Sequence, residues 1–390
     1  MNLLLHIGTE KTGTTSLQRW LTRNSDALRS HGIWYCASLG RPNNRLISTQ
    51  AVGLGVKDDS VRKLGLTTPD AYAAFRTELQ AKFAAEVEEA RAAGARTFVI
   101  SNEHMHSRLV RPAMVERVHD LVAARFSEID VVAVLRPQAD LAQSRLSVLA
   151  RTGHLSLDAT RIAKDHPFFD YFALWQRWTD VFGTLTCLPF RKHPDVIAAL
   201  SARLQVDPEA FSPVSRVNES LDVRAAALSY HAGQGARALM FLDDLPVEEP
   251  IRLSRAEAQR ITETFAEGNA HLVAACPTLE ADDLRPRLLS FPEQGNLAPA
   301  LAANPVARYT SHYVQRSTVQ LWLERCRTQL ALAERDHALN QPDAAKAALT
   351  RARDLLAQAD AAGLASVHPE LSRLRSRLQR VRTQVKKATR

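Results

Sequence analysis

Short apolar runs alternate with longer amphipathic segments over the first half of the chain. Such short runs, ended by glycine or polar residues, are typical of fully buried strands in a parallel sheet. The segments between them carry apolar residues at helical spacing. The runs that predict strands are residues 3–7, 33–36, 96–101, 129–135 and 185–188. The segments that predict helices are approximately residues 16–30, 69–93, 112–126, 140–151 and 168–182.

This order of strands and helices predicts an α/β protein, a three-layer α/β/α fold with a central parallel sheet. Ligands of such sheets bind beyond the carboxyl ends of the strands. Polar clusters follow three of the predicted strands, at residues 9–15, at residues 102–106 and at Arg136. We therefore expect these clusters to converge on one crevice.

The rest of the chain reads as helical. Residues 194–275 are mostly helical in pattern, and residues 276–310 are rich in proline and loop-like. We predict an α/β domain over residues 1–305 and an all-α extension over residues 306–390. Three helices are expected from about Thr318, divided near Pro342 and Gly363. Leu371, Leu374, Leu378, Val381 and Val385 form a short heptad seam, which suits an intramolecular hairpin or a coiled-coil dimer equally well.

Residues 37–69 contain many glycines, prolines and asparagines and are predicted to be irregular. A loop of this length inside a compact domain is usually functional or disordered. It is a candidate substrate-side loop, or alternatively an insertion without a role.

The formal net charge of +8 belongs to the end of the chain. From Arg373 onward there are eight basic residues and no acidic one. The rest of the chain therefore has 42 basic and 42 acidic residues. The body of the protein is therefore balanced, and no nucleic-acid partner is expected. The scattered cysteines, and the absence of a long apolar span or a signal-peptide pattern, predict reduced thiols and a cytoplasmic location.

The first predicted strand runs into a phosphate-binding type of loop. Gly8 and Gly13 have the spacing of a P-loop, and a helix pattern begins after them. Backbone N–H groups and the helix dipole favour an anion at such a turn. The lysine is displaced, however. Gly13 is followed by Thr14, and the lysine of the loop is Lys11. A plain strand-to-helix turn is the alternative.

Arg136 and Ser144 are a second, independent signal. An arginine at the end of a strand and a serine on the following helix can hold one phosphate from two sides. Taken alone, this pair would more often be an ion pair and a helix-facing hydroxyl.

Together, the loop Lys-Thr-Gly-Thr-Thr (residues 11–15) and the segment 132–144 resemble the two nucleotide-binding motifs of sulfotransferases that use 3′-phosphoadenylyl sulfate (PAPS). The likeness covers roughly the first 300 residues. It implies that Lys11 neutralises the oxygen bridging the sulfate and the 5′-phosphate. It also implies that Gly13, Thr14 and Thr15 hold the 5′-phosphate, with Thr12 and Ser16 as secondary candidates. Arg136 and Ser144 would hold the 3′-phosphate, and no metal is implied.

A sulfotransferase also needs a base for the acceptor proton. Glu103 is the first choice, because partial burial at the mouth of a strand raises a carboxyl pKa towards a useful range. His104 is the second, since its ordinary pKa suits the task. The structural alternative for Glu103 is a carboxylate that caps a helix or pairs with an arginine. His6 is expected to be a core histidine, and a zinc site at His104 and His106 is not expected.

The resemblance predicts an enzyme that transfers a sulfuryl group from PAPS to a hydroxyl or amine, on a carbohydrate or a small metabolite, and releases adenosine 3′,5′-bisphosphate. The expected partner is a small-molecule or glycan acceptor, and self-association through the C-terminal helices is left open. Two alternatives remain. One is a P-loop kinase or NTPase, which the missing Gly-Lys-Ser/Thr disfavours. The other is a non-catalytic, nucleotide-binding member of the fold.

Overall fold

The computed structural model describes residues 1–56, 58–155, 158, 161, 167–214, 220–231, 247–303, 306–361 and 369–388. The chain divides into two compact units, Met1–Ala303 and Asn304–Arg390. The first unit contains the sheet, and the second contains three long helices. Each unit is described below by itself.

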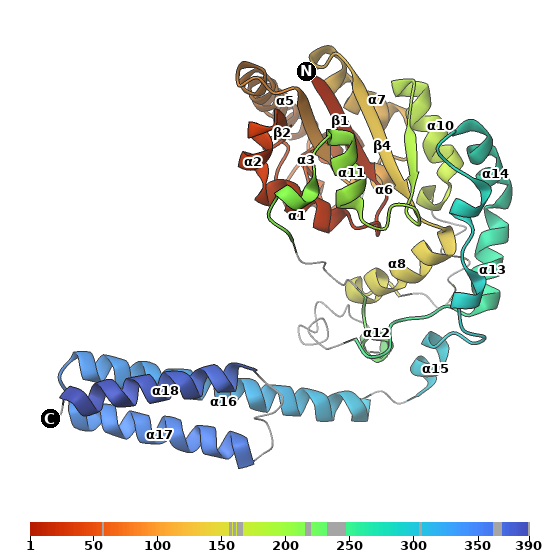
Figure 1. Ribbon diagram of the computed structural model, residues 1–390. Coiled ribbons are helices and arrows are strands. Elements are labelled where there is room, and N and C mark those ends of the chain that lie inside the picture. The colour runs from red at the N-terminus through yellow and green to blue at the C-terminus, as the bar shows by residue number, and fades with distance from the viewer. Residues whose placement is uncertain are drawn as a thin grey trace. The chain divides into compact units, whose positions relative to one another are not determined.

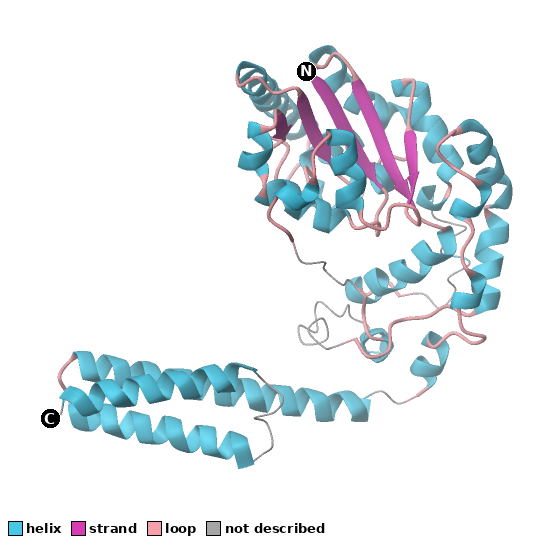
Figure 2. Cartoon of the chain, viewed as in Figure 1, coloured by secondary structure: helices cyan, strands magenta, loops and turns pink. Residues whose placement is uncertain are grey.

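The first unit is built on a sheet of five parallel strands, drawn in magenta in Figure 2. Their order across the sheet is β2-β3-β1-β4-β5, so the first strand lies at the centre. This arrangement confirms the predicted α/β class with a central parallel sheet. The strands are β1 (Asn2–Gly8), β2 (Ile33–Tyr35), β3 (Thr97–Ser101), β4 (Ile129–Leu135) and β5 (Thr186–Pro189).

Helices cover both faces of the sheet (Figure 1). On one face, Leu4 and Val132 of the sheet pack against Leu17 and Trp20 of α1 and against Leu200 of α11. On the other face, aromatic side chains such as Phe83 of α5 contact Phe98 of β3, with ring centroids 5.9 Å apart. The α-helices of this unit are α1 (Thr14–Arg23), α2 (Ser25–Ser30), α3 (Leu46–Val52), α4 (Asp59–Lys63), α5 (Pro69–Ala92), α6 (His104–Arg108), α7 (Pro112–Val122), α8 (Gln138–Thr152), α10 (Tyr171–Phe182), α11 (Val196–Leu204), α12 (Val223–His231), α13 (Arg255–Thr264), α14 (Ala266–Ala275) and α15 (Leu297–Ala302).

Three predictions of secondary structure were wrong in detail. The first predicted helix is two helices, because Asn24 interrupts it and its side-chain amide donates to the carbonyls of Trp20 (2.9 Å) and Ser212 (3.0 Å). The segment 37–69 is not irregular throughout, since it contains α3 and α4. Asp58 begins α4 by accepting hydrogen bonds from the amides of Ser60 and Val61. Residues 276–303 are also partly helical, with two 3₁₀ turns and α15.

The second unit packs α16 (Val306–Ala338), α17 (Pro342–Ala361) and α18 (Pro369–Ala388) around one apolar core. The first of these helices begins well before the predicted Thr318. Leu374, Val381 and Val385 of the heptad seam are buried in this core, and Leu378 packs against it. The side chain of Leu371 lies outside the described residues. The seam is thus used within the chain, and self-association stays a prediction. Of the helices described, none is both long enough and apolar enough to span a membrane.

Candidate functional site

The glycine-rich loop follows β1 and is fixed to its neighbour β4. The backbone N–H of Thr9 donates to the carbonyl of Val134 (3.0 Å), and the Thr9 hydroxyl donates to the same oxygen (2.8 Å). The hydroxyl of Thr12 donates to the carbonyl of Thr9 (2.7 Å). Thr12 is buried, so its hydroxyl holds the loop together.

The loop turns through two residues with left-handed backbone. Lys11 has φ 65° and Gly13 has φ 87°. At Gly13 a Cβ would lie 3.0 Å from Cγ1 of Val196, so glycine suits both the dihedral and the space. Gly13 is the N-cap of α1. Within the described residues no side chain caps this helix, and its first turn has no acidic residue. Such a helix start favours an anion.

Thr14, Thr15 and Ser16 form the first turn of α1, as the phosphate-loop prediction requires. Thr14 is buried, whereas Thr15 and Ser16 are half-buried. The backbone N–H of Ser16 donates to the carbonyl of Gly13 (3.0 Å), which closes the turn.

Arg136, at the end of β4, reaches this loop. Its Nη1 donates to the carbonyl of Lys11 (3.2 Å), and its guanidinium lies over the ring of Phe190 at 5.5 Å from the centroid. The hydroxyl of Tyr171 donates to the Arg136 carbonyl (2.7 Å). Burial lowers the pKa of Arg136, and Asp140 opposes this shift. The two sequence motifs therefore meet, although they are far apart in the chain.

Ser144 is half-buried on α8, the helix that lies beyond the carboxyl ends of β1 and β4 (Figure 1). In the described part of the chain no hydrogen bond joins it to Arg136. Its neighbour Arg145 is 3.6 Å from Oε2 of Glu10, another residue of the loop. Thus α8 also contacts the loop, through a residue that the sequence did not single out.

Glu10 carries the most strongly shifted carboxyl in this region. Burial alone would raise its pKa, but the hydrogen bond to the Ser107 hydroxyl and the electrostatic interactions with His104, Arg145 and His106 outweigh burial and lower the pKa to about 2. Glu10 is therefore ionised at neutral pH and stabilises the basic residues around the loop.

Glu103 lies where β3 ends, close to the loop. A Cβ on Gly8 would be 3.1 Å from the Cα of Glu103. The carboxylate accepts a hydrogen bond of 2.6 Å from the side-chain amide of Gln18 on α1. Glu103 is the N-cap of α6 but its side chain makes no cap hydrogen bond, and the ion pair it forms among described residues is with His104. The helix-capping and arginine-pairing alternatives are thus not observed.

His104 is the neighbour of Glu103 in space as well as in sequence. Its Nε2 is 3.6 Å from Oε1 of Glu103, and 24% of its side chain is exposed. Burial lowers its pKa below the ordinary value, although Glu103 opposes that shift. Within the described residues Nδ1 of His104 has no hydrogen-bond partner. A neutral imidazole next to a carboxylate can accept a proton.

The other two histidines near this edge are buried. His6 has Nδ1 2.8 Å from the hydroxyl oxygen of Ser101, and burial lowers its pKa to about 4. It is a core histidine, as expected. His106 is also fully buried. A search of the described residues found no group of three or more His, Cys, Asp or Glu able to hold a metal ion.

Part of the segment 37–69 packs against the end of β3. The Ser101 backbone N–H donates to Oδ1 of Asn44 (3.0 Å), and the side-chain amide of Asn102 donates to the carbonyl of Asn43 (2.7 Å). Next to them, Arg45 pairs with Asp58 at 2.5 Å. This segment therefore borders the site.

The structure thus brings Lys11, Glu103, His104 and Arg136 to one edge of the sheet. Gln18, Glu10 and Arg145 also belong to this region, and sequence reasoning missed them. Gln18 had one detectable signal, since it is a polar residue on the buried face of α1 beside Leu17 and Leu21. No signal in the sequence indicated that Glu10 would pair with Arg145.

No protein-family profile matches the chain, and a search of curated proteins found no match. Among solved structures, the chain is similar to a sulfotransferase from Alicyclobacillus acidocaldarius, with 18% sequence identity and a TM-score of 0.40. The similarity covers 73% of this chain and 98% of that one. A likeness at this level carries no functional argument by itself.

Proposed function

We propose that this protein is a sulfotransferase that moves a sulfuryl group from PAPS to a hydroxyl or amine of a carbohydrate or small metabolite. The observation that carries the proposal is the 3.2 Å hydrogen bond from Arg136 to the Lys11 carbonyl. This contact supports the proposal because it joins the loop to the arginine, and these two features resemble two separate nucleotide motifs.

The residues present fit such a nucleotide. The start of α1 offers an uncapped helix N-terminus without an acidic residue in its first turn. Gly13, Thr14 and Thr15 would bind the 5′-phosphate there, with Ser16 beside them, while Thr12 keeps the loop in shape. Arg136 and Ser144 would bind the 3′-phosphate. When bound, PAPS supplies an activated sulfuryl group on a phosphate leaving group.

Each remaining role belongs to a side chain of this site. Lys11 neutralises the negative charge that grows on the bridging oxygen as the sulfur–oxygen bond breaks. Glu103 takes the proton of the acceptor as the new bond to sulfur forms, and Gln18 holds that carboxylate in place. His104 is the alternative base, since burial keeps its imidazole neutral. The products are the sulfated acceptor and adenosine 3′,5′-bisphosphate.

Thermal denaturation with nucleotides tests the proposal. Adenosine 3′,5′-bisphosphate at about 100 times its Kd, without magnesium, should stabilise the protein by about 2.7 kcal/mol. Stabilisation by Mg-ATP alone would instead support a kinase or NTPase. A panel of sugars, amines and phenols should also be offered as acceptors. If the protein binds the bisphosphate but transfers sulfate from PAPS to none of them, it is a non-catalytic member of the fold. A cytoplasmic location stays a prediction.

A further inference from the structure

The C-terminal unit carries the positive charge of the protein. Residues 304–390 contain 16 Lys and Arg against 7 Asp and Glu, whereas residues 1–303 contain 34 against 35. The excess is concentrated on α18, where every residue after Glu370 is neutral or basic. Because the apolar side chains of α18 are buried in the three-helix core, its charged side chains lie on the outer side.

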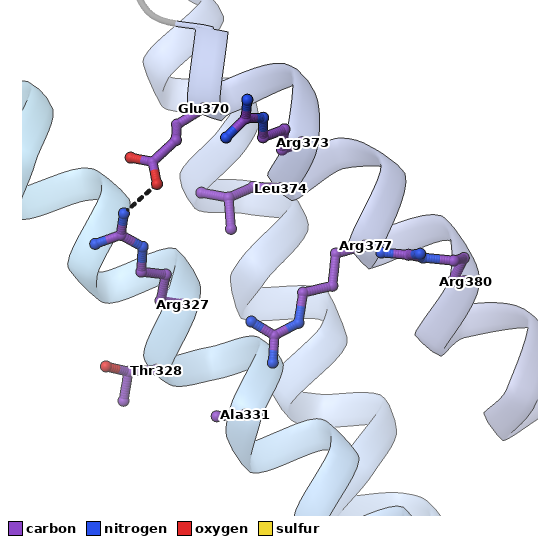
Figure 3. Close-up of a pocket in the computed structure, with 8 residues that line it drawn as sticks. All are labelled: Arg327, Thr328, Ala331, Glu370, Arg373, Leu374, Arg377 and Arg380. Atoms are coloured by element: carbon purple, nitrogen blue, oxygen red, sulfur yellow. Dashed lines mark hydrogen bonds and ion pairs between the residues drawn. The ribbon is translucent and has the colours of Figure 1, made fainter. Parts of the chain in front are cut away.

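Two hollows border α18 and share Arg380. The first, about 520 Å³, lies between α16 and α18 and is shown in Figure 3. Its arginines are Arg327 from α16 and Arg373, Arg377 and Arg380 from α18. The second, about 680 Å³, is lined by Arg375, Ser376, Gln379, Arg380, Thr383 and Gln384, and none of these described residues is acidic. We call the five arginines of these two hollows the basic face.

Carboxylates hold part of the basic face in position. Arg327 pairs with Glu370, as the dashed line in Figure 3 shows, and with Glu324 at 2.6 Å. Arg377 donates two hydrogen bonds to Glu334, of 2.6 and 3.0 Å. Neither Arg373 nor Arg380 forms an ion pair within the described residues, and both are exposed. Two fixed guanidinium groups thus stand beside two exposed ones, of which Arg380 is near enough to Glu334 to help lower the pKa of that carboxyl.

The lining of the hollows indicates the class of ligand. Among the described residues that line the two hollows there is no aromatic side chain on which the bases of a single-stranded nucleic acid could stack. Each has the volume of a small-molecule pocket, which suits the successive units of a thin polymer better than a double helix. Guanidinium groups bind sulfate and carboxylate through paired hydrogen bonds.

We infer that the basic face binds a linear glycan that carries sulfate groups. The inference rests on the proposed function in one respect: sulfuryl transfer to a carbohydrate makes such a glycan, so the ligand is the product or a partly sulfated acceptor. The site belongs to the C-terminal unit and is separate in sequence from the nucleotide motifs.

Titration of the full chain with a heparin oligosaccharide tests this inference. The double variant Arg373→Ala/Arg380→Ala should raise the Kd about tenfold, through the loss of two exposed ion contacts. The matched control is Arg351→Ala/Arg353→Ala, which removes the same charge from α17, a helix that lines neither hollow. The control should change the Kd less than about twofold, and both variants should retain the wild-type thermal unfolding midpoint.

Equal effects of the two variants, or no effect of either, would overturn the inference, because net charge or another surface would then explain the binding. Two competing ligands should also be titrated, a DNA duplex of about 20 base pairs and vesicles of anionic lipid. Tighter binding of either one than of heparin, through the same arginines, would also overturn the inference. Titration with adenosine 3′,5′-bisphosphate is a separate measurement. A chain that binds heparin through these arginines but not the bisphosphate supports the glycan site and contradicts the proposed function.

Discussion

The side-chain amide of Gln18 donates a 2.6 Å hydrogen bond to the carboxylate of Glu103. Gln18 is buried in α1, the helix whose first turn follows the glycine-rich loop. One helix therefore provides both the start that favours an anion and the contact that orients the candidate base. The position of the anion-binding helix start is therefore coupled to the position of the candidate base. An in-line displacement requires both to be fixed relative to each other.

Lys11 is the first residue to replace. Its φ of 65° lies in the left-handed region, where glycine is unstrained and alanine is not. Lys11→Gly should therefore remove the cation while keeping the free energy of unfolding within about 1 kcal/mol of wild type. We expect sulfuryl transfer from PAPS to fall about a thousandfold, because a donor to the developing charge is lost. Lys11→Ala should lose as much activity and be less stable. Near-normal turnover of the glycine variant would remove the role given to Lys11.

Glu103→Gln tests the identity of the base. The variant retains an oxygen that can accept from Gln18 but cannot take a proton. If Glu103 is the base, kcat should fall by about 10² to 10⁴, while the Kd of adenosine 3′,5′-bisphosphate stays the same.

The pH profile of kcat separates His104 from Glu103. A base at His104 loses activity as pH falls through its pKa, which burial has lowered from 6.5. The Glu103 carboxylate raises the pKa of His104. If His104 is the base, Glu103→Gln should move the acid limb of the kcat profile to lower pH and leave the rate at pH 8 unchanged. His104→Ala should abolish transfer only in that case, and should slow it modestly if Glu103 is the base.

Glu10 should contribute to stability at neutral pH. Its pKa is about 2 in the folded protein, below the ordinary 4.5. The stabilisation is thus present above pH 4.5 and is lost as pH falls towards 2. Glu10→Gln should lower the free energy of unfolding at pH 7 by up to about 3 kcal/mol and flatten its decline below pH 4.5. Denaturant unfolding from pH 7 to pH 3 measures this. Glu78→Gln, at an exposed position on α5, is the control and should change little.

Truncation after Ala303 should leave the first unit folded, because the chain divides there into two compact units. A cut at Thr318 would leave a stub of α16, so Ala303 is the better end. Residues 1–303 should unfold cooperatively and bind adenosine 3′,5′-bisphosphate as the full chain does. Aggregation or lost binding would show that the bundle supports the sheet domain.

The sheet could be predicted because its strands are apolar runs of the right length. The interruption at Asn24 could not, because Asn24 finds its partner in Ser212, a residue distant in sequence. Helix α3 was missed for a related reason. Ser48, Thr49 and Gln50 are polar but buried, so polar and apolar positions do not mark the exposed and buried faces of this helix. Its hydroxyls are satisfied locally, as when Thr49 donates to Ser60 at 2.8 Å.

The site divides in the same way. Lys11, Glu103 and Arg136 could be proposed because each directly follows a predicted strand, and the carboxyl ends of neighbouring strands lie together. The hydrogen bond of Gln18 to Glu103 and the ion pair of Glu10 with Arg145 depend on how helices pack over that edge. Local patterns contain no information about which polar residues will meet there.

The hydrogen bond from Arg136 to the Lys11 carbonyl has a consequence for ligand fragments. The Arg136 guanidinium holds the backbone of the loop and therefore makes the loop more rigid. The same group is the proposed ligand of the 3′-phosphate. Two half-ligands, one carrying only the 5′-phosphate and one only the 3′-phosphate, should therefore bind cooperatively. The affinity of either fragment alone would then underestimate its share in the intact nucleotide.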